Sequence, residues 1–460
     1  MSQYVESPEA AHVIEKQSEL VEVFHRAAKP RQAWRIGIEY ESLGVSRLSG
    51  RAMRYSGRRG IETVLRRLAE RLGWEPREEE GHVVALKGPG AAITLEPGGQ
   101  LELSGKQCET IHEAHQEFTE HVNSLIAVSA DLDLTFINLA MQPLSGLDDI
   151  QWVPKTRYRI MAPYMEAVGT LGHRMMKQSA SIQVNFDYGD EADAMMKFRV
   201  GMGLVPIFGA MFANSPITDG SLNGFMTMRG HVWTDTDRSR CGLLPFAFSK
   251  TLGFDAYVEY ALDVPMYFIV RRGRWIDMTG IPFRRFLAQG HQDERATHDD
   301  WLLHLTTLFP ETRLKTYLEI RCFDNVAQEL ALAAPALVKG IFYEPDCLWA
   351  AWDLVKRWSW EDRVAAYHGA HRQALGARVR GVTLLDLARE LIHIAWEGLE
   401  RHNRTNDRGE KESLYLDRLR EEVSRGQCPA YMIVERWMGA WNREIKALIE
   451  HSSYKAEHQS

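Results

Sequence analysis

The sequence predicts an α+β fold in which helices cover the apolar face of an antiparallel sheet. Four segments alternate polar and apolar residues with the two-residue period of a strand, and amphipathic helical segments lie between them. From residue 331 onward the pattern is almost wholly helical. We therefore expect residues 1–345 to form a sheet-containing domain and residues 346–460 to form a helical region packed on it, not an independent unit. The polar last twenty residues are expected to fray.

The first of the four segments, residues 93–105, has the pattern of a hairpin around a proline–glycine turn. If its arms pair antiparallel, Glu96 lies opposite Gln100 and Thr94 lies opposite Glu102. Two carboxylates then share one face with no basic residue between them, and they repel each other unless that face is solvated or holds a cation. For a hairpin taken alone, solvation is the simpler interpretation.

The other three segments repeat this arrangement of polar residues on one face of a strand. These residues are Glu39 and Glu41 in residues 32–44, Gln183 and Asn185 in residues 178–188, and Glu319 and Arg321 in residues 314–324. If the four strands are neighbours in one sheet, they form an acidic floor with amide groups and one guanidinium. Mg²⁺ prefers carboxylate oxygens and keeps waters or phosphates in its remaining positions, so this floor could seat ATP phosphates.

Composition and motifs exclude several classes of protein. A net charge of −7 argues against a nucleic-acid-binding protein with a broad basic surface. No run approaches about 20 apolar residues, so we expect neither a membrane span nor secretion. Five cysteines without a CxxC motif indicate reduced thiols in a cytoplasmic protein without a structural zinc site. The chain has neither GxxxxGK[ST] nor GxGxxG after a strand, so any nucleotide must be held without a phosphate-binding loop.

Two further patterns have an ordinary interpretation beside a functional one. Three histidines in the predicted helix 110–132 have a spacing that could suggest a metal site, but we interpret them as surface or core histidines. They are His112, His115 and His121. Residues 231–242, HVWTDTDRSRCG, gather aspartates and arginines around one tryptophan, which suits a loop that grips a zwitterion and equally suits a solvated loop.

Six motifs occur along the chain in one order. They are EPGGQLELSG at 96–105, SIQVNFDY at 181–188, FANSP at 212–216, HVWTDTDRSRCGLLPF at 231–246, YALDVPMYF at 260–268 and DWLLHLTTLFPETRLKTYLEIR at 300–321. Together they resemble the glutamate–cysteine ligases of plants and proteobacteria. The resemblance runs from about residue 36 to about residue 343, and more loosely through the helical tail.

The resemblance implies a glutamine-synthetase-like fold, with an antiparallel sheet curved into a funnel, for the catalytic domain. It implies an enzyme that uses ATP to phosphorylate the γ-carboxylate of L-glutamate, after which the amine of L-cysteine attacks to give γ-glutamylcysteine, ADP and phosphate. Two or three Mg²⁺ ions, small-molecule substrates only, and a monomer or homodimer are expected.

The resemblance also assigns roles to residues, by motif. Arg240 would bind the glutamate carboxylate, Arg321 would stabilise charge on the transferring phosphoryl group, Trp233 would wall the amino-acid pocket, and Asn185 would sit beside the metal ions. The expected Mg²⁺ ligands are Glu39, Glu41, Glu96, Glu102, Gln183 and Glu319. No acid or base of unusual pKa is required, because phosphoryl transfer depends mainly on positioning and charge neutralisation.

The sequence departs from the family pattern at two places. Ser42 stands where the family has lysine, and Cys322-Phe323 stands where it has Gly-Ala. Both places adjoin the expected site, so a γ-glutamyl ligase that uses a different amine is the first alternative. A catalytically silent homologue that binds nucleotide or amino acid is the second, although retaining the carboxylates without their ions would be costly.

Overall fold

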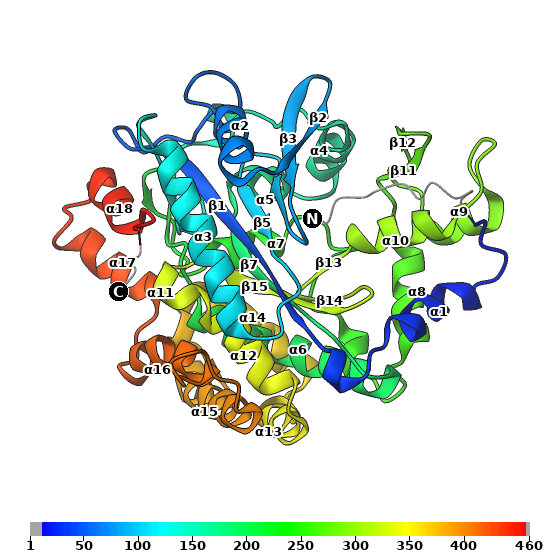
Figure 1. The fold of residues 1–460 in the computed structure, drawn as a ribbon. Helices are drawn as coiled ribbons and strands as arrows, with labels where there is room; N and C mark the ends of the chain where they lie inside the picture. The colour runs from blue at the N-terminus through cyan, green and yellow to red at the C-terminus, as the bar shows by residue number, and fades with distance from the viewer. Residues whose placement is uncertain (1–11, 457–460) are drawn as a thin grey trace.

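The computed structural model describes residues 12–456, and a nine-stranded antiparallel sheet runs through its centre (Figure 1). The hydrogen-bonded order is β14-β15-β7-β1-β5-β4-β3-β2, and β6 pairs with the second half of the long strand β1. The strands are β1 (Ile36–Ser46), β2 (Glu75–Glu79), β3 (His82–Lys87), β4 (Ala92–Leu95), β5 (Leu101–Ser104), β6 (Leu134–Ile137), β7 (Ser181–Phe186), β14 (Thr312–Leu314) and β15 (Leu318–Asp324). The predicted α+β class with an antiparallel sheet is confirmed.

Short two-stranded pairs lie outside this sheet. They are β8 (Ile217–Thr218) with β9 (Ser221–Leu222), β10 (Cys241–Gly242) with β13 (Phe309–Pro310), β11 (Phe268–Arg271) with β12 (Arg274–Asp277), and β16 (Arg378–Val379) with β17 (Val382–Thr383).

The predicted hairpin forms β4 and β5. Thr94 pairs with Glu102, and the backbone N–H of Glu96 donates to the carbonyl of Gln100 at 2.9 Å, as the alternation predicts. The turn is tight because Gly99 has φ = 87°. At Gly98 a Cβ atom would clash with the backbone of Lys177, so the turn also needs glycine to pack against the following helical layer.

The four predicted polar strands are consecutive neighbours in the order β15-β7-β1-β5. Their register places Glu41 opposite Glu102, and Glu39 opposite Gln183. On the far side of β7, Asn185 pairs with Glu319. The shared polar face expected from the sequence is therefore present.

Helices cover the other face of the sheet and its ends, and α4, α5 and α7 lie over its polar face. They are α1 (Ser18–Ala27), α2 (Ile61–Leu72), α3 (Ile111–Ser129), α4 (Thr156–Val168), α5 (Gly172–Gln178), α6 (Glu191–Met211), α7 (Met228–Trp233), α8 (Phe254–Asp263), α9 (Phe283–Gln289), α10 (His298–Thr306), α11 (Gln328–Ala331), α12 (Ala333–Phe342), α13 (Pro345–Val355), α14 (Trp360–Gln373), α15 (Leu384–His402), α16 (Asp417–Ser424), α17 (Pro429–Met438) and α18 (Ile445–Ser452). Tyr40 of β1 stacks on Phe118 of α3 with 4.3 Å between ring centroids, so the apolar face of β1 is part of the core.

In Figure 1, helices α12 to α16 group below the sheet, whereas α1, α8, α9 and α10 form a flank at the right. One hydrophobic core extends from Ile14 to Tyr454 and crosses the expected boundary at residues 345 and 346. The division into 1–345 and 346–460 stays a prediction.

Among the described residues one helix, α6, has the length and apolarity of a membrane span, but 83% of its apolar window is buried inside the protein, as in a core helix.

Both ends of the described chain differ from expectation. Apolar residues at helical spacing predict a helix over about residues 7–28, but α1 begins at Ser18, and residues 7–11 lie outside the described part. The expected fraying is wrong for residues 441–456, because α18 packs there and Tyr454 is buried. The Tyr454 hydroxyl lies 2.9 Å from Ser42 Oγ, and its backbone N–H donates to the Phe136 carbonyl. Burial of Leu448, Ile449 and Tyr454 outweighs the polar composition around them.

Candidate functional site

Four glutamates converge on the polar side of the sheet, and we call this group the acidic face. Its members are Glu39 and Glu41 of β1, Glu96 directly after β4, and Glu102 of β5. The structure thus brings together carboxylates that lie up to 63 residues apart in sequence.

Two members of the acidic face, Glu41 and Glu102, accept hydrogen bonds from neutral donors. Glu41 accepts from the backbone N–H of Ser181 at 2.7 Å and from Gln183 Nε2 at 3.1 Å. Glu102 accepts from Thr94 Oγ1 at 3.1 Å and from Ser104 Oγ at 2.8 Å. These donors bring no positive charge to the two carboxylates.

The protein environment makes ionisation of Glu41 unfavourable. Burial, followed by the nearby charges of Glu96 and Glu102, raises the pKa of Glu41 from 4.5 to about 8. The amide of Asn185 donates to Glu39 at 3.2 Å, while its buried Oδ1 has no hydrogen-bond partner among the described residues. A crowded set of carboxylate and amide oxygens is the donor set that Mg²⁺ prefers, so the residues present fit the expected metal.

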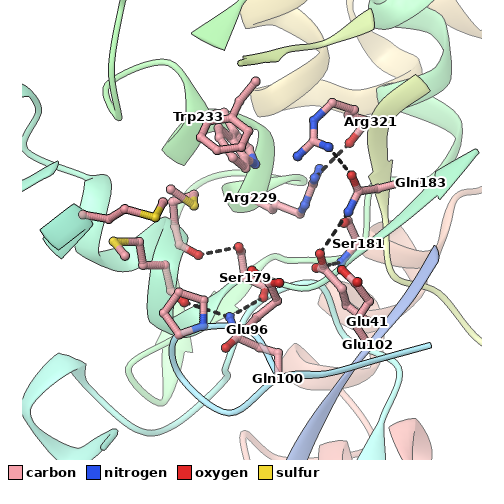
Figure 2. Close-up of a pocket in the computed structure, with 15 residues that line it drawn as sticks. Glu41, Glu96, Gln100, Glu102, Ser179, Ser181, Gln183, Arg229, Trp233 and Arg321 are labelled. Carbon is pink, nitrogen blue, oxygen red and sulfur yellow. Dashed lines mark hydrogen bonds between the residues drawn. The ribbon is translucent and has the colours of Figure 1, made fainter. Parts of the chain in front are cut away.

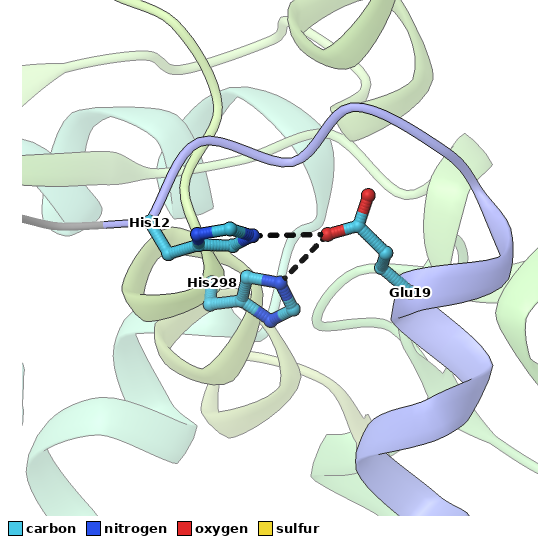
Figure 3. A group of neighbouring side chains, drawn as sticks. All are labelled: His12, Glu19 and His298. Carbon is cyan, nitrogen blue, oxygen red and sulfur yellow. Dashed lines mark hydrogen bonds and ion pairs between the residues drawn. The ribbon is translucent and has the colours of Figure 1, made fainter.

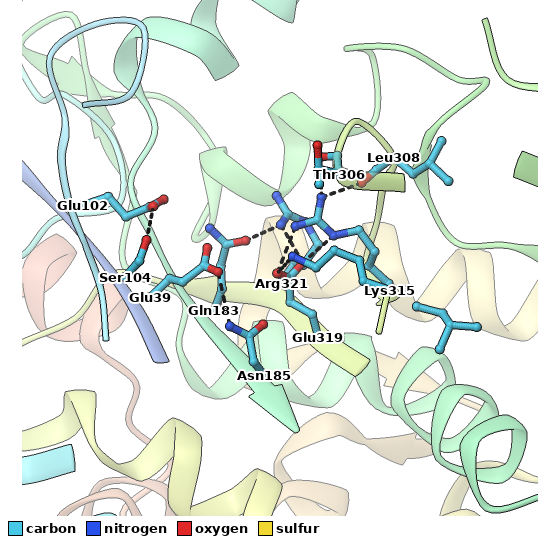
Figure 4. Close-up of polar contacts among 12 residues, drawn as sticks. Glu39, Glu102, Ser104, Gln183, Asn185, Thr306, Leu308, Lys315, Glu319 and Arg321 are labelled. Carbon is cyan, nitrogen blue, oxygen red and sulfur yellow. Dashed lines mark hydrogen bonds and ion pairs between the residues drawn. The ribbon is translucent and has the colours of Figure 1, made fainter. Parts of the chain in front are cut away.

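Glu319 has the opposite surroundings, which we call the Glu319 clamp (Figure 4). Arg313 donates two hydrogen bonds to it, at 2.7 and 2.9 Å, while Lys315 Nζ lies at 3.1 Å and Arg321 Nη1 at 2.8 Å. Burial alone would raise the pKa of Glu319, but the three cations hold it well below its ordinary value. Arg321 also donates to Gln183, which links the clamp to the acidic face.

A cavity opens above the acidic face and extends toward α7 (Figure 2). Glu41, Glu96 and Glu102 form its floor, and Arg229 and Arg321 lie opposite them. Apolar side chains close the remaining wall, namely Trp233, Phe309, Met161, Met175 and Met176. Trp233 is therefore placed in the cavity wall, and its part in an amino-acid pocket stays a prediction.

Sequence reasoning missed Arg229, a buried residue of the short helix α7. Its Nη2 donates to the carbonyl of Arg321 at 2.9 Å, and its Nη1 lies 4.0 Å from Asp324. Its buried Nε and the buried Nε1 of Trp233 have no hydrogen-bond partner among the described residues. Two unused donors in one cavity suit an anionic ligand. No periodicity marks Arg229, because it reaches the site from a helix after a glycine-rich loop.

A second cavity lies on the other side of Glu39. Asn185, Tyr317, Lys29 and Arg35 also line it, so it combines acidic, amide and basic groups. Glu39 and Glu41 therefore face two different cavities, although they are neighbours on one face of β1.

Arg240 lies elsewhere. Its guanidinium is fully buried, with Nε 2.6 Å from Asp237, Nη2 donating to the Pro265 carbonyl at 2.6 Å and Nη1 donating to the Thr307 carbonyl at 3.2 Å. It also lies 4.0 Å from the ring centroid of Tyr267. Arg240 lines neither cavity. Its expected contact with a substrate carboxylate stays a prediction.

The two departures from the family pattern do not line either cavity. Ser42 points away from the polar face toward Tyr454. Phe323 packs against Phe208 and Phe212 of the core, with ring centroids 5.1 and 4.9 Å away, and Cys322 is buried. Cys322 and Phe323 directly follow the cavity-lining Arg321, but a bulge after Ile320 turns Phe323 toward α6. The effect of these two residues on the choice of amine stays a prediction.

The histidines of α3 lie apart from the acidic face. His112 Nδ1 and His115 Nδ1 lie 2.9 and 3.2 Å from the Tyr415 hydroxyl, and burial lowers the pKa of His121 to about 4. Their interpretation as packing residues agrees with these contacts.

Comparison with known proteins gives a consistent result. The family model for glutamate–cysteine ligase family 2 matches residues 35–451. The chloroplastic glutamate–cysteine ligases of Nicotiana tabacum and Arabidopsis thaliana are each 40% identical to the chain over 439 residues, which is 95% of this chain and 82% of theirs. Ligase B of Oryza sativa subsp. japonica is 39% identical over 93% of this chain and 85% of its own.

A solved structure shares the architecture. The crystal structure of glutamate–cysteine ligase from Francisella tularensis in complex with AMP matches with a TM-score of 0.54 at 15% sequence identity, covering 91% of this chain and 87% of that one. At this identity the match concerns the fold alone, and it confirms the glutamine-synthetase-like fold that the motifs predicted.

Proposed function

The chain belongs to glutamate–cysteine ligase family 2, and we propose that it joins the γ-carboxylate of L-glutamate to the amine of L-cysteine at the expense of ATP. The product is γ-glutamylcysteine, the first intermediate of glutathione synthesis. The observation that carries this proposal is the acidic face beside two cavity-lining guanidiniums, those of Arg229 and Arg321, in a chain 40% identical to enzymes of that name.

The proposed reaction has two steps. A γ-carboxylate oxygen of glutamate attacks the γ-phosphorus of ATP, and the bond to ADP breaks. The cysteine nitrogen then attacks the carbonyl carbon of the γ-glutamyl phosphate, phosphate leaves with the bonding electrons, and the amine loses a proton. Both steps need alignment and stabilisation of negative charge more than a tuned acid or base.

The expected Mg²⁺ would be held by the acidic face, with Gln183 and Glu319 as the further ligands that the motifs suggest. When bound, Mg²⁺ would neutralise phosphate charge and orient the phosphates. The number of ions, two or three, is part of the proposal. Of these proposed ligands, the residues of the acidic face fit Mg²⁺ best, because Glu319 already contacts three cations.

The chain's own residues supply the remaining functions. Arg321, which is fixed by Glu319 and Gln183, would stabilise charge on the transferring phosphoryl group. Arg229 offers an unused buried donor to a substrate carboxylate, and Trp233 helps exclude water. Arg240 keeps its proposed role toward glutamate, although its contacts suit a residue that fixes the loop at Asp237.

The decisive experiment supplies the purified protein with ATP, Mg²⁺, L-glutamate and a panel of amines, and measures ADP release and product mass. We expect ADP and γ-glutamylcysteine only when cysteine is present. Turnover with another amine but not with cysteine would establish the alternative acceptor. Absence of ADP with every amine would leave the catalytically silent homologue.

Partners and location complete the proposal. We propose small-molecule substrates only, without nucleic acid or membrane, and a monomer or homodimer. A cytoplasmic location stays a prediction from the reduced cysteines, whereas the plant relatives are named as chloroplastic.

A further inference from the structure

Two histidines and a glutamate meet on the flank formed by α1 and α10, and we call them the histidine–glutamate cluster (Figure 3). His12 precedes α1, Glu19 lies in the first turn of α1, and His298 is the first residue of α10. None of the three lines either cavity at the acidic face. The cluster is therefore separate from the proposed ligase site.

The spacing of the three ligand atoms suits one metal ion. Glu19 Oε2 lies 3.4 Å from His12 Nε2 and 3.1 Å from His298 Nε2, and all three atoms lie within 4.8 Å of one another. A tetrahedral ion with bonds of about 2.0–2.1 Å holds its ligand atoms about 3.3 Å apart. The observed distances bracket that value.

Contacts behind the cluster hold its ligands in this arrangement. Glu19 Oε1 accepts the backbone N–H groups of Glu15 at 3.0 Å and Lys16 at 2.8 Å, so Oε2 remains directed at the histidines. The backbone N–H of His298 donates to the His12 carbonyl at 3.0 Å, which holds the two histidine backbones together. Outer hydrogen bonds of this kind orient metal-binding side chains in proteins.

We propose that the histidine–glutamate cluster binds one divalent transition-metal ion of the Zn²⁺ type through His12, Glu19 and His298. Two imidazole nitrogens and one carboxylate oxygen favour Zn²⁺ over Mg²⁺, which prefers oxygen ligands. Exposure of the site leaves a fourth position for water. The absence of CxxC motifs pointed away from structural zinc, but this cluster uses no cysteine.

The bound ion would tie the segment before α1 to the start of α10. Two hydrogen bonds already connect these segments. The backbone N–H of Ile14 donates to the Ala296 carbonyl, and the indole N–H of Trp301 donates to the Leu20 carbonyl. At its other end α10 reaches Thr306, whose carbonyl accepts from Arg313 of the Glu319 clamp. The ion would thus stabilise the flank that supports the clamp.

The test titrates the metal-free full-length protein with Zn²⁺ in the presence of saturating Mg²⁺, so that the acidic face is occupied. Calorimetry measures stoichiometry and affinity, and Co²⁺ in place of Zn²⁺ reports tetrahedral coordination by its visible absorption. The variants are His12→Ala and His298→Ala. His393→Ala is the matched control, because His393 is similarly exposed and pairs with Glu397 at 3.3 Å outside the cluster.

We expect the wild type and His393→Ala to bind one equivalent of Zn²⁺ with the same affinity. His12→Ala and His298→Ala should bind it with at least tenfold lower affinity. Zn²⁺ should also slow proteolysis before α1 in the wild type and in His393→Ala, but in neither cluster variant. Because the His12 side chain is 73% exposed, its replacement leaves the fold intact and the test conclusive even if His298→Ala misfolds. Equal Zn²⁺ binding by the wild type and His12→Ala, or no binding by the wild type, would overturn the proposal.

Discussion

The acidic face and the Glu319 clamp occupy one side of one sheet, yet their electrostatics are opposite. Glu41 and Glu102 are held by amide and hydroxyl donors, whereas Glu319 is held by two guanidiniums and an ammonium group. Burial and the charges of Glu96 and Glu102 raise the pKa of Glu41, whereas the three cations of the clamp lower that of Glu319. The same residue type on neighbouring strands therefore serves two purposes.

The difference indicates where ligands of each charge bind. A group of crowded carboxylates attracts metal ions, and a clamp with more cations than carboxylates attracts phosphate oxygens. Gln183 joins the two regions, since it donates to Glu41 and accepts from Arg321. A metal-bound phosphate at this junction would meet both regions at once.

The largest expected effect follows the loss of one carboxylate from the acidic face. Glu102→Gln should lower kcat by at least about 10²-fold, because it removes a charge that offsets the metal ions in the transition state. Steady-state assays over a range of Mg²⁺ concentrations measure the effect, with the exposed Glu120→Gln on α3 as control. Unchanged activity at limiting Mg²⁺ would remove Glu102 from the metal site.

The same substitution in the clamp should affect folding as well as catalysis. Glu319→Gln leaves Arg313, Lys315 and Arg321 without their shared carboxylate, and breaking a buried pair costs about 3–5 kcal/mol. Urea unfolding should therefore show a larger loss for Glu319→Gln than for Glu102→Gln. Equal losses in the two variants would contradict the contrast between the regions.

Strand periodicity explains how much of this site could be predicted from sequence. Because side chains alternate across a strand, Glu39 and Glu41 had to share a face, and so did Gln183 and Asn185. The strand order and the bulge that turns Phe323 away depend on pairing between distant segments, which local pattern does not encode.

Residues brought in by loops and helix ends escaped the sequence argument for the same reason. Arg229 reaches the cavity because Thr227 caps α7 and bonds to Asp324 at 2.9 Å, a contact across 97 residues. The histidine–glutamate cluster joins residues 279 positions apart, Glu19 and His298. In both cases tertiary packing places the side chain.

A smaller effect should separate the two arginines that could bind glutamate. Arg229→Lys should raise the glutamate KM about tenfold, since it removes the unused Nε donor in the cavity. Arg240→Lys loses buried contacts to Asp237 and two carbonyls, so we expect a lower Tm and a smaller change in KM. The exposed Arg238→Lys is the control. A rise in glutamate KM for Arg240→Lys alone, at unchanged Tm, would restore the motif-based assignment.

The smallest effect concerns the pH dependence of the metal-free protein. Folding raises the pKa of Glu41 from 4.5 to about 8, so between these values the folded state holds a proton that the unfolded state releases. By linkage, the free energy of unfolding falls as pH rises through this window. Bound Mg²⁺ favours the carboxylate form and should weaken or reverse that slope.

In Glu41→Gln this contribution of Glu41 to the pH dependence disappears. Without Mg²⁺, the urea midpoint of Glu41→Gln should therefore fall less toward pH 8 than that of the wild type. The control, Glu120→Gln, should follow the wild type. Parallel pH profiles for Glu41→Gln and the wild type would show that the acidic face carries no excess negative charge before its ligands arrive.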